Sequence, residues 1–114
     1  MRRTILCIDS NRPHLLEKKA ALERAGYSVT VAPNEELGLQ ALRTQWVDCV
    51  VLPGEDGGQL AVELKHEYPS LPVVMHPCPL EPEPEVEWMM CACLPDEATP
   101  QEVTAAIQGI FAAD

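Results

Sequence analysis

The chain has 114 residues and a formal net charge of −10, which together predict a single acidic domain over residues 1–114. This acidity argues against a sequence-independent hold on nucleic acid, whose phosphates it would repel, and against anionic membrane surfaces. No stretch approaches the roughly 20 apolar residues of a membrane span, and the apolar run that follows Arg2 and Arg3 is too short for a signal peptide. We therefore expect a cytoplasmic protein.

Apolar runs and helix signals alternate along the chain. The first run, Thr4 to Ile8, is unbroken until Asp9, which is typical of a strand covered on both faces. Strands are predicted at 4–8, 27–31, 49–52, 71–75 and 90–94. Helices are predicted at 13–25 before a stop at Gly26, after the cap Asn34, at 59–68, and after the capping box Thr99–Glu102. Five strands alternating with helices indicate an α/β fold with a parallel sheet and helices on both faces.

The segment between the fourth and fifth predicted strands is rich in proline and glutamate. It reads HPCPLEPEPEVEWMM, with prolines at 77, 79, 82 and 84. Each proline removes a backbone donor and restricts the residue before it. We expect a fourth helix that is short or disrupted, with at most a turn or two over residues 85–89.

The chain contains five cysteines, an odd number, and no recognisable export signal, so we expect reduced thiols. Free cysteines in apolar strand-like runs pack as small hydrophobic residues, and four lie in such runs: Cys7, Cys49, Cys91 and Cys93. The alternative is a metal or redox sensor built from His76, Cys78, Cys91 and Cys93. It is the weaker interpretation because neither cysteine spacing is the C-x-x-C of ordinary zinc sites.

Three long segments resemble the receiver domain of two-component response regulators, and together they cover essentially the whole chain: residues 4–42, residues 48–75 and CLPDEATPQEVTAAI at 93–107. The resemblance implies a flavodoxin-like, three-layer fold with five parallel strands in the order 2-1-3-4-5. It also implies the parts of a phosphoryl-transfer site. These are an acidic pair for Mg²⁺, an acceptor aspartate after the third strand, a Ser/Thr, a Lys and a switch aromatic.

Most of these parts are missing from the sequence. The family's positions fall on Asp9 and Ser10 for the acidic pair, Pro53 for the acceptor, Pro77 for the Ser/Thr, Asp96 for the Lys and Cys93 for the switch aromatic. Matching Pro53 to the family's loop proline would place Cys49 at the acceptor position instead. Only Asp9 is retained, and Asp96 replaces the expected cation with a negative charge. The resemblance therefore implies a pseudo-receiver without a phosphoacceptor, with Mg²⁺ bound weakly or not at all.

Three functional hypotheses follow. The first is a non-catalytic interaction module that acts independently of aspartyl phosphorylation and binds proteins, a kinase or a separate regulatory protein among them, with a homodimer left open. The second is a receiver with an unconventional acidic site, in which Asp9, Glu55 and Asp56 are phosphorylated or coordinate a cation. The third is the Cys/His sensor described above.

The candidate partner surface lies in the proline-rich segment. Its acidic fringe and apolar centre are Glu83, Glu85, Glu87, Trp88 and Met89. An exposed tryptophan there would be a binding hot spot, and the acidic rim would steer a basic partner. The competing interpretation is that Trp88 covers the sheet beside a short helix. No nucleotide-binding glycine motif or nucleophile elbow is present in the sequence, so we expect no enzymatic activity and no cofactor.

Overall fold

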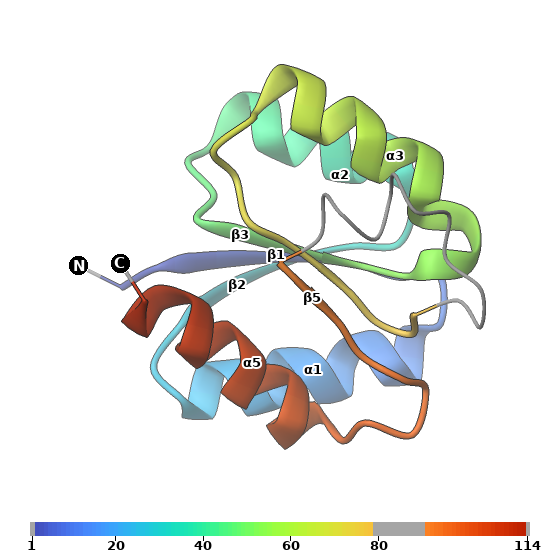
Figure 1. Cartoon of the computed structure of the whole chain (residues 1–114). Helices are drawn as coiled ribbons and strands as arrows, with labels where there is room; N and C mark the ends of the chain where they lie inside the picture. Colours follow the sequence, from blue (N-terminus) through green and yellow to red (C-terminus); the bar gives the residue numbers. More distant parts are fainter. Residues whose placement is uncertain (1, 79–90, 114) are drawn as a thin grey trace.

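Five parallel strands form the middle layer of a three-layer α/β sandwich (Figure 1). The computed structural model describes residues 2–78 and 91–113, with the backbone alone for 55–58. The strands stand in the order β2-β1-β3-β4-β5, which confirms the predicted topology. Their bounds in chain order are β1 Thr4–Ile8, β2 Ser28–Ala32, β3 Cys49–Leu52, β4 Val73–Met75 and β5 Ala92–Cys93.

Two helices cover each face of the sheet in the described part of the chain. Helices α1 (Arg12–Arg24) and α5 (Pro100–Ala112) lie on one face, and α2 (Glu35–Thr44) and α3 (Gly54–Glu67) lie on the other (Figure 1). The predicted caps are present. The Asn34 side chain accepts from the Leu37 amide at 2.9 Å, and Thr99 forms the complete capping box at the start of α5.

Each face of the sheet has its own apolar layer. The layer under α2 and α3 includes Leu6, Ile8, Val50, Leu52, Leu60, Leu64 and Met75. The layer under α1 and α5 includes Ile5, Cys7, Leu15, Leu22, Val51, Val103 and Ile107. Because strand side chains alternate between faces, the central strands contribute to both layers. This explains the unbroken apolar runs of β1 and β3.

Helix α3 begins at Gly54, five positions before the predicted start at Gln59, so that prediction is wrong. Glu55 and Asp56 therefore belong to the first turn of a helix and not to a loop. The pattern hid this turn because residues 54–58 have no apolar periodicity and contain three glycines, which lower helix propensity without excluding a helix. The predicted fourth helix and the start of the fifth strand at Met90 lie outside the described residues.

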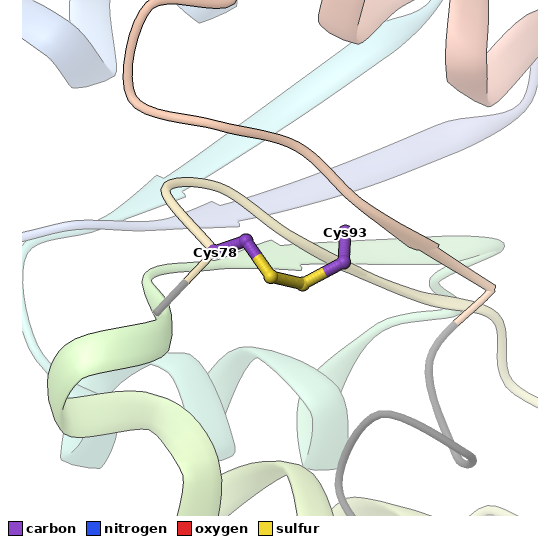
Figure 2. The surroundings of a disulfide bond; sticks show 2 residues. All are labelled: Cys78 and Cys93. Atoms are coloured by element: carbon purple, nitrogen blue, oxygen red, sulfur yellow. A yellow bond between two sulfur atoms is a disulfide. The ribbon is translucent and has the colours of Figure 1, made fainter. Parts of the chain in front are cut away.

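The cysteines differ from the expectation of five reduced thiols. A disulfide joins Cys78, three residues after β4, to Cys93 in β5, and the two Cα atoms are 5.2 Å apart (Figure 2). The sequence could not indicate this pairing, because it depends on two strand ends that are adjacent in the sheet. Cys91 is exposed and not in the core, whereas Cys7 and Cys49 are buried as predicted.

Candidate functional site

The residues that directly follow β1, β3 and β4 lie together at the carboxyl edge of the sheet. Ile8 of β1 pairs with Ala32 of β2, and Cys7 pairs with Val51 of β3, so Asp9 and Pro53 both stand just beyond their strand ends. His76 follows β4, and its amide donates to the Leu52 carbonyl at 2.9 Å. This edge is where open parallel sheets bind ligands.

The strand register distinguishes the two candidate acceptor positions. Cys49 opens β3 and pairs with Ile5, near the amino edge of the sheet. Pro53 follows the last residue of β3, on the same edge as Asp9. Of the two residues, Pro53 is the one beside the retained carboxylate, and its side chain has no nucleophilic atom.

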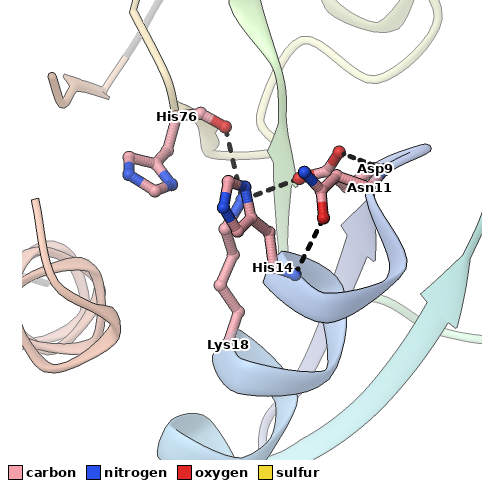
Figure 3. Close-up of polar contacts among 5 residues, drawn as sticks. All are labelled: Asp9, Asn11, His14, Lys18 and His76. Atoms are coloured by element: carbon pink, nitrogen blue, oxygen red, sulfur yellow. Dashed lines mark hydrogen bonds and ion pairs between the residues drawn. The ribbon is translucent and has the colours of Figure 1, made fainter. Parts of the chain in front are cut away.

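Lys18 of α1 lies against Asp9 in the interior of this edge (Figure 3). Its ammonium Nζ is 3.3 Å from Oδ2 of Asp9, and the two side chains are 3% and 8% exposed. Lys18 also donates to the His76 carbonyl at 3.3 Å, and the Asn11 amide donates to Oδ1 of Asp9 at 2.9 Å. Both carboxylate oxygens of Asp9 therefore have donors from the protein itself.

The Asp9–Lys18 pair corrects the expected charge balance of the pocket. Sequence reasoning placed Asp96 where a receiver carries its cation and left Asp9 without a positive partner. Asp96 lies exposed in the loop between β5 and α5, and the cation beside Asp9 comes from α1. Asp9 therefore has a positive partner within the fold.

The His76 imidazole is buried next to this pair. The residue is 6% exposed, and neither ring nitrogen has a hydrogen-bond partner within the described part of the chain. Burial, and then the positive charge of Lys18, lower the pKa of His76 below its ordinary value. The imidazole is therefore held in its neutral form at neutral pH.

The remaining predicted positions are spread around this edge. Ser10 is exposed beside Asp9, and Pro77 is half-buried, with its carbonyl accepting from the Gly54 amide at 2.8 Å. Cys93 is half-buried and bonded to Cys78. The surface made of Glu83, Glu85, Glu87, Trp88 and Met89 lies outside the described residues. A cavity of about 150 Å³ next to Asp9 is lined in part by Pro53, Asn34 and Glu35.

Solved structures of response regulator receivers match the chain over almost its whole length. A CheY-like receiver domain protein from Methanospirillum hungatei JF-1 matches with a TM-score of 0.85 and 18% identity, covering 99% of this chain and 96% of its own. The receiver domain of an HD domain-containing protein from Pseudomonas fluorescens Pf-5 matches with a TM-score of 0.83 and 21% identity, covering 99% of this chain and 97% of its own. An orphan response regulator of H. pylori matches with a TM-score of 0.81 and 17% identity, covering 96% of this chain and 98% of its own. The chain has the receiver fold.

Sequence comparison adds nothing to this likeness, since no protein-family model and no curated protein matches the chain. At these identities the structures establish the receiver fold alone. The fold does not determine the function, which depends on the side chains at the site. No helix in the described part of the chain is long and apolar enough to cross a membrane. Among residues 2–78 and 91–113, no group of three or more His, Cys, Asp and Glu side chains is arranged to hold a metal ion.

Two residues that sequence reasoning missed stand out on this receiver fold. Lys18 could have been found, because it lies three residues after Leu15 and four before Leu22, on the buried stripe of α1. A lysine on an apolar stripe predicts a buried ion pair. Trp46, between α2 and β3, is 80% exposed, and no periodic pattern distinguishes such a residue from a covered one.

Proposed function

We propose that this chain is a non-catalytic signalling module of the response-regulator receiver type, which binds a protein partner and acts without aspartyl phosphorylation. The observation that carries the proposal is the buried Asp9–Lys18 pair beside Pro53. The single carboxylate retained from the family's acidic site is already neutralised by the protein. The residue that follows the neighbouring strand β3, Pro53, cannot accept a phosphoryl group.

Loss of the nucleophile supports this proposal most directly. Phosphoryl transfer to a protein needs an oxygen nucleophile in line with the phosphoryl group, together with cations that neutralise its charge. Pro53 and Pro77 supply no side-chain oxygen at the ends of β3 and β4. Because these parts act jointly, Asp9 alone does not rebuild the reaction.

The position of Lys18 argues against Mg²⁺ at Asp9. A bound Mg²⁺ would lie about 2.1 Å from a carboxylate oxygen. The Lys18 ammonium is 3.3 Å from Oδ2 of the same carboxylate. Two cations this close repel one another by on the order of several kcal/mol at an effective dielectric constant of about 20. The ammonium thus takes the place of the metal, and the site needs no cofactor.

The first experiment tests the chemistry. The protein is incubated with acetyl phosphate and Mg²⁺, and its intact mass is measured. We expect no increase in mass, and we expect beryllofluoride with Mg²⁺ to leave the amide spectrum unchanged. A stable gain of one phosphoryl group on an aspartate or glutamate would overturn the proposal.

The second experiment tests the role of Lys18. We expect Mg²⁺ to leave the amide signals around Asp9 unchanged in the wild type. The Lys18→Met variant leaves Asp9 without its cation, so Mg²⁺ should shift these signals. The double variant Asp9→Asn/Lys18→Met should lose the response again. Mg²⁺-dependent shifts in the wild type that disappear in Glu55→Gln or Asp56→Asn would favour the unconventional acidic site instead.

The partner surface is tested by substitution of the two tryptophans. With the acidic fringe at residues 83–87, the partner we propose is a protein with a basic face, whose binding weakens as salt rises. In a pull-down, Trp88→Ala should abolish binding and Trp46→Ala should retain it. The reverse result would move the working surface to the amino edge of the sheet. Sedimentation equilibrium of the chain alone tells whether the partner is a second copy.

A further inference from the structure

The five cysteines occupy three different environments. Cys7 and Cys49 lie inside the sheet, where burial raises the pKa of each thiol to about 12. A thiol with so high a pKa carries almost no thiolate at neutral pH, so neither is reactive. Cys91 is exposed and free. Cys78 and Cys93 are bonded to each other, and both residues are half-buried, in contrast to the buried Cys7 and Cys49.

The disulfide lies where the sheet is weakest. Strand β5 consists of two residues and, among residues 2–78 and 91–113, pairs only with β4, through Val74–Ala92 and Met75–Cys93. A short edge strand has few hydrogen bonds to hold it and opens easily. The covalent bond joins this strand to the chain that leaves β4 (Figure 2).

The segment that carries Cys78, residues 76–78, extends to the candidate site. Its three residues, 76–78, each carry a hydrogen bond to a different element. The His76 carbonyl accepts from Lys18 at 3.3 Å, and the Pro77 carbonyl accepts from the Gly54 amide at 2.8 Å. The Cys78 amide donates to the Leu94 carbonyl at 2.6 Å. The disulfide thus links β5 to a segment that also contacts α1 and the first residue of α3.

We propose that Cys78 and Cys93 form a reversible redox site, which exchanges two electrons with thiols and disulfides of low molecular weight. The redox state of this pair determines whether β5 is covalently linked to residues 76–78. The proposal does not depend on the absence of phosphorylation, because it concerns different atoms. It also gives the Cys/His cluster a definite chemistry, in which the two sulfur atoms bind each other instead of a metal.

The exchange is balanced as follows. The thiolate of a reductant such as glutathione attacks one sulfur of the Cys78–Cys93 bond, which forms a mixed disulfide and releases the other cysteine as a thiolate. A second glutathione thiolate attacks the mixed disulfide and releases glutathione disulfide. Two protons from water convert the two cysteine thiolates to thiols. The reverse reaction uses glutathione disulfide as the oxidant.

The cellular setting favours a switch over a permanent bond. In the cytoplasm, where we expect this chain, disulfides are usually transient and serve catalysis or redox sensing. Both residues of the bond are half-buried, whereas Cys7 and Cys49 are fully buried, so a small thiol meets less covering chain at the Cys78–Cys93 bond. Cys91, two residues before Cys93, supplies an exposed thiol for comparison within the same molecule.

The site is tested by counting thiols in the folded protein. The wild type is equilibrated in buffers of defined ratio of glutathione to its disulfide, alkylated with iodoacetamide and weighed intact. We expect the number of adducts to rise from one, on Cys91, to three as the buffer becomes reducing, and to return to one when the ratio is reversed. The control Cys91→Ser should show zero and two. Failure of the bond to form in oxidising buffer, or resistance to reduction until the protein unfolds, would overturn the proposal.

A second measurement tests the mechanical consequence and needs no variant. Amide hydrogen exchange is recorded in the oxidised and reduced wild type. The amides of Cys78 and Leu94, which bond across β4 and β5, should exchange about tenfold faster or more after reduction, because weakly held edge elements open at low cost. The amides of the central strands β1 and β3 should not change. Equal exchange of Cys78 and Leu94 in both states would refute the proposed coupling.

Discussion

The amino and carboxyl edges of the sheet, where the parallel strands begin and end, each hold an aspartate, and the surroundings of the two aspartates differ. At the carboxyl edge, Asp9 is buried and paired with the ammonium of Lys18. At the amino edge, Asp48 accepts from two neutral groups, the Thr4 amide at 2.7 Å and the indole N–H of Trp46 at 2.9 Å. One carboxylate is paired with a cation inside the fold, and the other is half-buried and accepts from neutral donors.

The two edges also differ in the volume of the open space beside them. The cavity beside Asp9 holds about 150 Å³. A groove at the amino edge holds about 410 Å³, and Trp46, Tyr68 and Phe111 are among its lining residues. Open parallel sheets usually bind ligands at the carboxyl edge. Here the carboxylate at that edge is paired with the protein's own Lys18, and the larger of these two spaces lies at the opposite edge.

The largest expected effect comes from breaking the charge pair at the carboxyl edge. Lys18→Met leaves the Asp9 carboxylate buried without its cation, and removing one partner of a buried pair costs about 3–5 kcal/mol of unfolding free energy. Lys19→Met is the matched control. Lys19 is the next residue in α1 and pairs with Glu23 at 3.8 Å on the surface, so its loss should cost at most about 0.5 kcal/mol. Urea unfolding measures both.

The double variant Asp9→Asn/Lys18→Met shows whether the cost belongs to the pair. Without the carboxylate, no buried charge remains unpaired, so the double variant should be more stable than Lys18→Met alone. Equal losses for Lys18→Met and Lys19→Met would contradict the buried pair and, with it, the contrast between the two edges.

A smaller effect is expected where α2 approaches β1 just before Asp9. A Cβ at Gly38 would lie 2.9 Å from Cγ1 of Ile8, which is itself buried. Overpacking of about 1–3 kcal/mol should outweigh the gain of about 1 kcal/mol in helix propensity, so Gly38→Ala should lower the unfolding free energy. Gly109→Ala in α5 has open space around the new methyl group and should raise it by up to about 1 kcal/mol. A stabilised Gly38→Ala would show that α2 can move away from the edge.

The pH dependence of stability reports on His76 at the same edge. Burial and then Lys18 lower its pKa in the folded state, while the nearby backbone of Ala98, which completes no hydrogen bond to the ring, and then Asp96 and Asp9 act more weakly in the opposite direction. The unfolded chain therefore binds the proton more readily. Stability should be fully present above the unfolded pKa of about 6.5 and should fall as the pH drops below it toward the folded pKa.

Urea unfolding between pH about 7.5 and about 5.5, on either side of the unperturbed histidine pKa, checks this expectation. His76→Gln should reduce the loss of stability on acidification. The control His66→Gln removes an exposed imidazole from α3 and should leave the wild-type slope in place. A slope that is the same in all three proteins would show that His76 titrates as it does in the unfolded chain.

The sequence predicts local features of this molecule better than long-range ones. The strand Cys49–Leu52 and the caps Asn34 and Thr99 match their predictions, because apolar runs and capping residues act over a few neighbours. The Cys78–Cys93 bond joins positions 15 residues apart and depends on which strands are adjacent. The Asp9–Lys18 pair depends on which face α1 presents to the sheet. Both required the assembled fold.

The smallest effect is expected at the amino edge, and it sharpens the contrast with Lys18. Trp46→Phe removes the indole hydrogen bond to Asp48 but changes the buried surface area little, since Trp46 is 80% exposed. The unfolding free energy, followed by circular dichroism so that the lost indole does not affect the signal, should change by at most about 0.5 kcal/mol. A loss above about 1 kcal/mol would mean that the indole packs against the groove. In that case the amino edge would be covered much as the carboxyl edge is around Asp9, and the contrast between the two edges would fail.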